Sequence, residues 1–125
     1  MSLVFYRVLG FTPVFAYGSA EFTQQFTCPT APENYSGVTF EIGGGLFEIA
    51  DGHIAVKSEV FEEHIGSSKI SAMFDVASVD DLVEVCRRND IQIAVEPRVF
   101  PWGTKEVVIK DPDGFVLVFR EFVNK

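Results

Sequence analysis

The second half of the chain has the clearer pattern of apolar and polar positions. Residues 68–76, SKISAMFDV, alternate between the two classes, which is the period of a strand with one buried face. Apolar residues then recur at the spacing of a helix, at Val79, Leu82, Val83 and Cys86. Apolar segments predict three more strands, at residues 91–97, 105–110 and 115–122. The predicted order of elements is therefore β-α-β-β-β.

Local signals mark the ends of these elements. Ser78 is a suitable N-cap, and Asp81 stands at the third helical position, as in a capping box. Pro97 is expected to end its strand, because proline cannot donate to the hydrogen-bond ladder of a sheet. The sequence DPDG at residues 111–114 predicts a tight turn, with Gly114 free to adopt a left-handed conformation.

The first half follows a similar order less regularly, and we read it as a helix followed by strands. Residues 2–11, SLVFYRVLGF, predict a short helix that ends at Gly10. Residues 28–37, CPTAPENYSG, are expected to form a loop. Strands are expected at TPVFAYG (12–18), FTQQFT (22–27), VTFEI (38–42) and LFEIA (46–50), the last two forming a hairpin around GGG. Unlike the second half, this half has no strand before its helix.

Composition narrows the class of protein. The chain has 125 residues, 47% of them hydrophobic, and 13 Phe, which is enough for a globular core and for a pocket or an interface besides. The net charge of −8 disfavours binding to nucleic acid, and it either attracts cationic ligands or only maintains solubility. Two cysteines, Cys28 and Cys86, make no disulfide framework, and Cys86 is expected to be a buried thiol. With no signal peptide and no membrane-spanning apolar run expected, we predict a soluble, cytoplasmic protein.

Three stretches resemble the vicinal oxygen chelate superfamily, which includes glyoxalase I, extradiol dioxygenases and the bleomycin resistance proteins of bacteria. FYRVLGF (5–11) is similar to the helix-end motif of that family, and SAMFDVASVDDL (71–82) is similar to the strand-to-helix entry of its second module. WG (102–103) followed by VVIKDPDGFVLVF (107–119) resembles its final hairpin.

The resemblance implies an α+β fold of paired βαβββ modules, each with its sheet rolled into a half-barrel. The chain is then a single domain over residues 1–125. Its first module is expected at residues 1–52, a connector with one helical turn at 53–67, and its second module at 68–122. The family's first strand precedes FYRVLGF, so the first module is expected to lack that strand. An unpaired sheet edge near LFEIA would then favour a homodimer.

Enzymes of this family hold one divalent metal with His, Gln or Glu side chains from four strands. The resemblance places two of these positions at Ser71 and Val118 and a third at Glu48, while the fourth belongs to the missing strand. One carboxylate cannot hold a catalytic divalent ion of this class. We therefore expect no catalytic residues, no metal at these positions and no cofactor. His53 and His64 are expected to be solvated residues of the connector.

A ligand pocket is expected in place of the metal. If Ser71 and Val118 face the cavity, the strand period turns Met73, Asp75, Val116 and Arg120 the same way. The alternate residues would pack under the helices: Ala72, Phe74, Val76, Leu117 and Phe119.

Two further residues are candidates for this pocket. Trp102 would either cover a ligand ring at the entry or pack at the rim. Glu48 would either act in binding, pair with Arg120, or lie near solvent.

The leading hypothesis is a non-enzymatic protein that binds and sequesters a small molecule, similar to the bacterial bleomycin resistance proteins that confer antibiotic resistance. Its ligand is expected to be cationic or aromatic and drug-like. The alternative is a metal-dependent lyase, isomerase or dioxygenase whose missing ligands come from elsewhere. A third interpretation is an interaction module with a vestigial cavity. The expected partners are a small-molecule ligand and a second copy of the chain, with no nucleic acid and no membrane.

Overall fold

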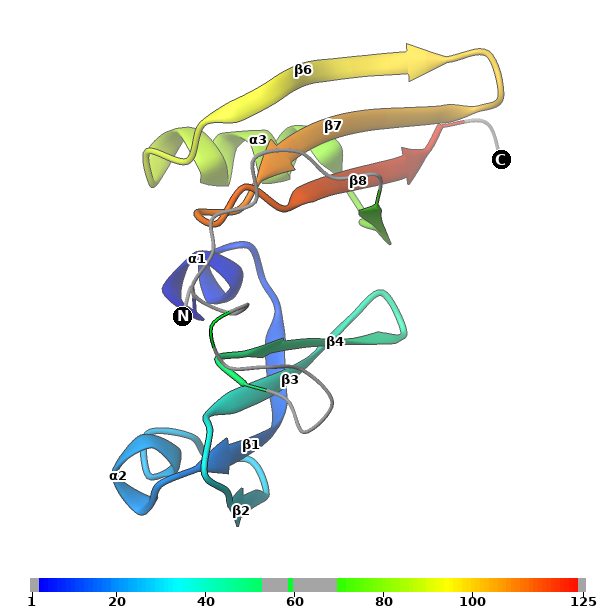
Figure 1. Ribbon diagram of the computed structural model, residues 1–125. Helices are drawn as coiled ribbons and strands as arrows, with labels where there is room; N and C mark the ends of the chain where they lie inside the picture. Colours follow the sequence, from blue (N-terminus) through cyan, green and yellow to red (C-terminus); the bar gives the residue numbers. More distant parts are fainter. Residues whose placement is uncertain (1–2, 53–58, 60–69, 124–125) are drawn as a thin grey trace. The chain divides into compact units, whose positions relative to one another are not determined.

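A computed structural model describes residues 3–52, 59 and 70–123. The chain forms two compact units (Figure 1). Unit 1 comprises residues 1–3 and 10–63, and unit 2 comprises residues 4–9 and 64–125. The expected connector falls almost entirely outside the described residues, as do His53, His64 and the predicted helical turn beyond Glu59.

Unit 2 contains the β-α-β-β-β order that the sequence predicts. Its elements are β5 (Ser71–Asp75), α3 (Val79–Arg88), β6 (Ile93–Phe100), β7 (Thr104–Lys110) and β8 (Val116–Phe122). The strands form one open sheet in the order β5-β8-β7-β6, in which β5 and β8 are parallel and the other pairs antiparallel. Helix α3 lies along one face of this sheet (Figure 1).

Helix α3 begins where the capping signals predicted. The Ser78 Oγ accepts a hydrogen bond of 3.1 Å from the amide of Asp81, and a carboxylate of β8, Glu121, accepts one of 2.8 Å from the amide of Val79. The helix is followed by Asp90 with a φ of 55°, a left-handed conformation that glycine usually supplies at this position. The start of the helix is therefore defined by the local cap together with a distant carboxylate of β8.

The core of unit 2 lies between α3 and the sheet. The buried side chains come from the apolar stripe of the helix and from alternate positions of β7 and β8: Val79, Leu82, Val83, Cys86, Val107, Ile109, Leu117 and Phe119. The expectation that Leu117 and Phe119 pack under a helix is confirmed, and Phe74 stacks on Phe119 with ring centroids 5.4 Å apart. Cys86 is a fully buried thiol, as expected, and burial raises its pKa.

Helix α1 (Leu3–Val8) ends near Gly10, which has a φ of 92°. Its Tyr6 is fully buried and donates a hydrogen bond of 2.5 Å to the Oδ2 of Asp111 in the β7–β8 turn. The Oδ1 of the same carboxylate accepts hydrogen bonds from the amides of Asp113 and Phe115. Residues 4–9 accordingly group with unit 2.

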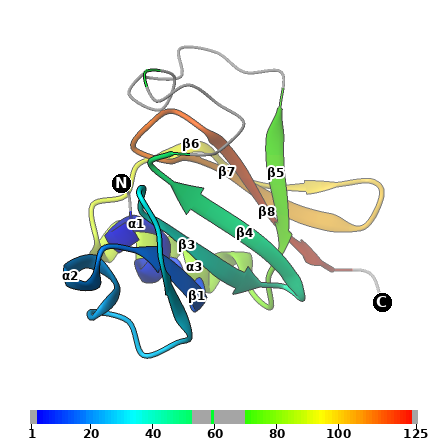
Figure 2. The ribbon, with the colours of Figure 1, turned by 60° about the horizontal axis from the view of Figure 1, so that its bottom comes forward.

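Unit 1 contains β1 (Thr12–Gly18), α2 (Ala20–Thr23), β2 (Thr30–Pro32), β3 (Gly37–Ile42) and β4 (Gly45–Ala50). Its sheet has the order β2-β1-β3-β4, so β4 is an edge strand of the described sheet. Figure 2 shows β1, β3 and β4 side by side. The hairpin around the glycines is confirmed, with Gly43 and Gly44 at φ values of 58° and 80°.

Three local predictions were wrong. Residues 22–27 form no strand, because the Ser19 hydroxyl caps the short helix α2 by accepting from the amide of Phe22. The predicted loop at 28–37 contains the short strand β2, which pairs in parallel with β1. Strand β6 continues through Pro97 to Phe100, because β6 lies at the sheet edge and the register shifts between Val95 and Arg98.

Candidate functional site on the open face of unit 2

The sheet of unit 2 has one face turned away from α3, which we call the open face. Alternate residues of β8 are buried against the helix, and the residues between them lie on the open face. The register pairs Ser71 with Val116, Met73 with Val118 and Asp75 with Arg120. The six residues predicted to share one face therefore do so.

Charged side chains form a line across all four strands, which we call the charged row. It alternates in sign through neighbouring pairs in the order Asp75, Arg120, Glu106 and Arg98. The Arg120 Nε donates to the Oδ1 of Asp75 at 2.5 Å, and these side chains are only partly exposed, at 32% and 52%. Paired charges of this kind bring polarity to the face without a large net charge.

An apolar row runs beside the charged row. It consists of Met73, Val118, Val108 and Val95, one residue from each strand. Met73 and Val95 are 52% and 53% exposed, although both are large apolar residues. Such a row could cover the flat surface of an apolar molecule.

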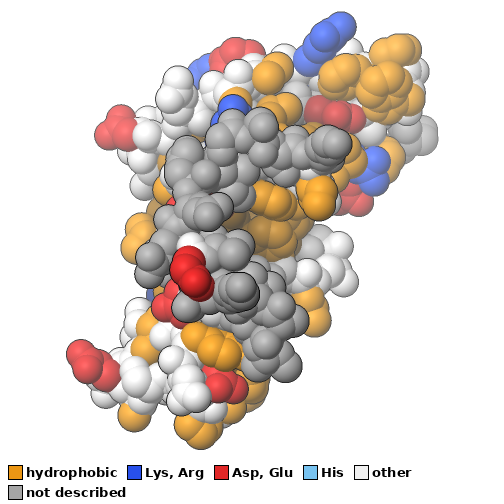
Figure 3. Space-filling view, in the orientation of Figure 1, with side chains coloured by type: hydrophobic (Ala, Val, Ile, Leu, Met, Phe, Trp, Pro, Cys, Tyr) orange, Lys and Arg blue, Asp and Glu red, His pale blue; other side chains and the backbone are white. Residues whose placement is uncertain are grey.

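Aromatic rings lie at the other side of the charged row, near the β6–β7 turn. The Trp102 ring stacks on Phe100 with centroids 4.5 Å apart and an interplanar angle of 13°, and Trp102 remains 66% exposed. Its Nε1 donates to the Oε2 of Glu106 at 3.2 Å, and the same oxygen accepts from the Thr104 hydroxyl. Hydrophobic side chains gather at this turn in the space-filling view (Figure 3).

The two arginine side chains of the charged row also lie over aromatic rings. The guanidinium of Arg98 lies 5.2 Å from the centroid of Phe100, and that of Arg120 lies 4.8 Å from the centroid of Phe122. The sequence interpretation named Arg120 and Trp102 but missed Arg98, Phe100 and Glu106. The period of two was visible in β6 and β7, but only the register shows which residues adjoin the charged row.

The residues at the family's metal positions do not suit a divalent ion. Val118 has no donor atom, and its cross-strand neighbours are Met73 and Val108. Ser71 is paired with Val116, and its hydroxyl is a weak ligand for such a metal. Over the described residues, no group of three or more His, Cys, Asp and Glu is arranged to hold a metal ion.

Glu48 belongs to unit 1, on β4. Its carboxylate is hydrogen-bonded to the hydroxyl of Tyr17, while Arg120 is paired with Asp75. Desolvation of Tyr17 and its hydrogen bond to Glu48 raise the pKa of the Tyr17 hydroxyl, which therefore remains protonated. Glu48 thus contacts an aromatic residue within its own unit.

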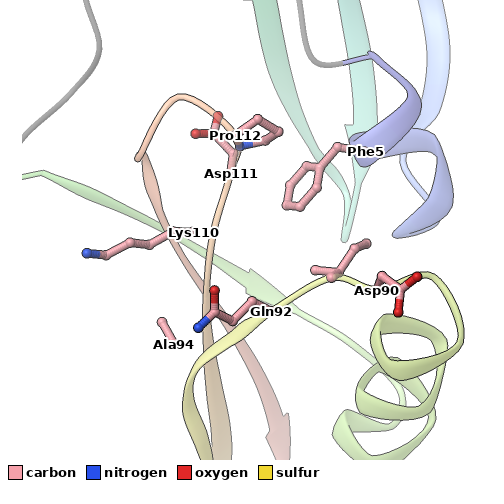
Figure 4. Close-up of a pocket in the computed structure, with 8 residues that line it drawn as sticks. Phe5, Asp90, Gln92, Ala94, Lys110, Asp111 and Pro112 are labelled. Atoms are coloured by element: carbon pink, nitrogen blue, oxygen red, sulfur yellow. The ribbon is translucent and has the colours of Figure 1, made fainter.

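Unit 2 also contains a hollow of about 500 Å³ that the sequence did not suggest. Figure 4 shows Phe5 of α1 pointing into it, with Asp90 after α3, Gln92 before β6 and Lys110 at the end of β7 around it. Its wall combines one cation with two carboxylates and offers no arrangement of nucleophile and base. Exposed apolar and aromatic side chains, among them Met73, Val95 and Trp102, gather instead on the open face.

The fold can be compared with known proteins. The family model described as the glyoxalase/bleomycin resistance protein/dioxygenase superfamily matches residues 1–119. The chain belongs to this superfamily. No curated protein sequence matches the chain.

Solved structures of the glyoxalase/bleomycin resistance protein/dioxygenase superfamily resemble the chain at low identity. A member of this superfamily from Nocardioides is 17% identical, with a TM-score of 0.61, over 98% of this chain and 75% of the other. The fosfomycin resistance protein FosX from Listeria monocytogenes, solved with Mn(II) and sulfate, is 14% identical, with a TM-score of 0.59, over 95% of this chain and 79% of its own.

TioX from Micromonospora sp. ML1 is 18% identical over 71% of this chain and 68% of its own, with a TM-score of 0.51. At these identities the structures support the α+β fold of the superfamily and no particular activity. In the described part of the chain, no helix combines the length and apolar character needed to cross a membrane.

Proposed function

We propose that this member of the glyoxalase superfamily is a non-enzymatic protein that binds and sequesters a small molecule on the open face of unit 2. The observation that supports the proposal best is the combination of the apolar row with the exposed stack of Phe100 and Trp102. Large apolar and aromatic side chains that remain exposed in a soluble domain are typical of a binding surface.

The chemistry of the face suggests the class of ligand. A flat ring would lie against Met73 and Val118, or stack on Trp102, and the alternating charges beside them would orient polar substituents. The net charge of −8 attracts a cation from a distance, so a planar aromatic cation suits the protein better than an anion. Sequestration needs no turnover, because binding alone lowers the concentration of free ligand.

The test uses proflavine, a planar aromatic cation, and the fluorescence of the single tryptophan, Trp102. Binding at this face should quench Trp102 and raise the melting temperature, with a gain of about 2.7 kcal/mol in stability at a ligand concentration 100 times Kd. Met73→Gln should weaken binding about fivefold, since it removes apolar contact from a half-exposed position. Leu46→Gln makes the matched change on an exposed residue of unit 1 and should leave binding unchanged.

Metal analysis distinguishes this proposal from the enzymatic alternative. The purified protein is expected to contain zinc, iron, nickel and manganese well below one equivalent. One equivalent of a metal whose removal abolishes a lyase, isomerase or dioxygenase activity would refute the proposal. If a screen of planar aromatic compounds and cations shows no stabilisation and no change in Trp102 emission, a role in protein interaction would replace it.

A further inference from the structure

Unit 1 has an unusual distribution of charge. From residue 8 to residue 56 the sequence contains no lysine and no arginine. The same stretch has several carboxylates, namely Glu21, Glu33, Glu41, Glu48 and Asp51. A ligand bound to this stretch would therefore meet negative charge with no internal counter-ion, which favours a cation and disfavours an anion.

A hollow of about 280 Å³ lies in this unit, lined by aromatic rings. Phe15 and Tyr17 project from β1, and Tyr35 comes from the segment before β3. The rings of Tyr17 and Tyr35 meet edge to face with centroids 5.7 Å apart, and Phe15 lies 6.3 Å from Tyr17. Because the rings are tilted to one another, they can surround one small group with π faces and edges. They do not form a slot for a flat molecule.

Two glycines make room for the tyrosine rings. Gly37 is paired with Tyr17 across β1 and β3, and a Cβ at Gly37 would collide with the end of the Tyr17 ring. A Cβ at Gly52 would lie 2.6 Å from the Cβ of Tyr35. Glycine inside a strand costs stability, so its use at Gly37 is explained by the close approach of the ring.

Hydrogen bonds hold the segment that presents Tyr35. The amide of Ser36 donates to the Oδ1 of Asp51 at 2.7 Å, and the amide of Asp51 donates to the carbonyl of Ser36 at 2.9 Å. This reciprocal pair fixes the backbone on both sides of the contact between Tyr35 and Gly52. The ring position is therefore set before any ligand arrives, which lowers the entropic cost of binding.

Two carboxylates complete the hollow. Glu48 lies in the wall and is hydrogen-bonded to the hydroxyl of Tyr17, and Glu33 lies in the wall beside β2. Exposed carboxylates next to aromatic faces are the pattern by which proteins recognise alkylated ammonium groups, through cation–π attraction and charge. Two carboxylates beside three aromatic rings favour an organic cation over a bare metal ion, which prefers more oxygen ligands.

We propose that unit 1 binds the alkylated ammonium group of a small organic cation in the hollow formed by Phe15, Tyr17, Tyr35, Glu33 and Glu48. This site goes beyond the function proposed above, because it uses none of the side chains of the open face of unit 2. Cation–π contact supplies affinity for the methyl-bearing face of the ammonium group. The carboxylates attract its positive charge, so a neutral analogue binds more weakly, and they repel an anionic analogue.

The test compares choline with 3,3-dimethylbutan-1-ol, a neutral molecule of the same shape, by NMR titration of the whole protein. Choline should bind with a Kd on the order of 1 mM, with its methyl protons shifted upfield by the rings. The neutral isostere should bind about tenfold more weakly. Emission from Trp102 should not change, which separates this site from the one on the open face.

Matched variants locate the interaction. Glu48→Gln should weaken choline binding about threefold, while Glu21→Gln, which removes the same charge from α2, should have little effect. Tyr35→Leu should weaken binding and Tyr35→Phe should not, because Phe keeps the π face and both variants keep apolar bulk at a half-buried position. Equal binding of choline and its neutral isostere would overturn the proposal, as would equal effects of the two glutamine variants.

Discussion

At the scale of single residues, the contact between Tyr6 and Asp111 joins two segments that are far apart in the sequence. Tyr6 is in the FYRVLGF segment and Asp111 begins the DPDG turn, and these are two of the stretches on which the family resemblance rests. The carboxylate accepts from the tyrosine hydroxyl with one oxygen and from two turn amides with the other. One residue therefore holds both the turn and helix α1.

Tyr6→Phe should lower the free energy of unfolding by about 2 kcal/mol, because it removes a buried hydrogen bond to a charged group and leaves the Oδ2 of Asp111 without this donor. Urea unfolding at pH 7 measures the change. Tyr35→Phe, at a half-buried tyrosine, is the matched control and should cost less than about 0.5 kcal/mol. Equal losses of unfolding free energy in the two variants would show that the hydrogen bond from Tyr6 to Asp111 does not stabilise the fold.

The same contact predicts a dependence on alkaline pH. Burial and the hydrogen bond to Asp111 raise the pKa of Tyr6 above its ordinary value of 10.0. The unfolded state then releases this proton at a lower pH than the folded state, so stability is complete below about pH 10 and falls as the pH rises further. Between pH 8 and 11, the free energy of unfolding should decrease less steeply for Tyr6→Phe than for the unmodified chain.

At the scale of elements, helix α3 shows how local and distant residues combine at one helix end. Ser78 and Asp81 form the local cap, and Glu121 on β8 satisfies the amide of Val79. A second link, the 2.6 Å ion pair between Lys105 and Asp80, connects the first turn of the helix to β7. The helix is thus attached to the sheet at the end where its amides would otherwise be free.

Ser78→Ala should lower the free energy of unfolding by about 1 kcal/mol, because the amide of Asp81 loses its acceptor. Ser78→Asp keeps an acceptor at the same position and should restore most of the stability. Thermal unfolding followed by circular dichroism measures both variants. Equal stability of the alanine and aspartate variants would mean that Glu121 alone determines the start of the helix.

At the scale of the whole molecule, β4 bears on assembly because it is an edge strand of the described sheet of unit 1. Strand β8 of unit 2 is flanked by β5 and β7, whereas β4 is the terminal strand of the described sheet of unit 1. Leu46 on this strand is 72% exposed. An exposed edge strand with an apolar residue invites pairing with a second chain. We therefore propose a homodimer that buries on the order of 1,600 Å² in total.

Light scattering at micromolar concentration should give twice the chain mass of 13.9 kDa. Leu46→Lys should shift the protein toward the monomer, because it places a charge on the edge strand. Val4→Lys, at a residue of α1 that is 76% exposed, introduces the same charge on unit 2 instead of on β4 and should not. A monomer at all concentrations would disprove the dimer. Added salt should strengthen the dimer, because it screens the repulsion between two chains that each carry a net charge of −8.

The periodicity of the sequence alone determined most of the fold of unit 2. The strand period of two, applied to β5 and β8, predicted which residues share a face, and the capping residues predicted the start of α3, because both signals act between neighbours in the chain. The DPDG turn and the glycine hairpin followed from backbone preferences of the same local kind. These features needed no information about distant residues.

Only the tertiary structure decided which residues of the candidate sites lie next to one another. The charged row alternates in sign because four strands align in one register, and no spacing within a single strand reveals that alignment. Pro97 lies inside a strand because β6 is at the edge of the sheet, which the sequence pattern could not show. Glu48 contacts Tyr17 because their strands lie in the same sheet, and Arg120 pairs with Asp75 because β5 and β8 are neighbours. Contacts between distant residues depend on strand order, and strand order is a property of the folded chain.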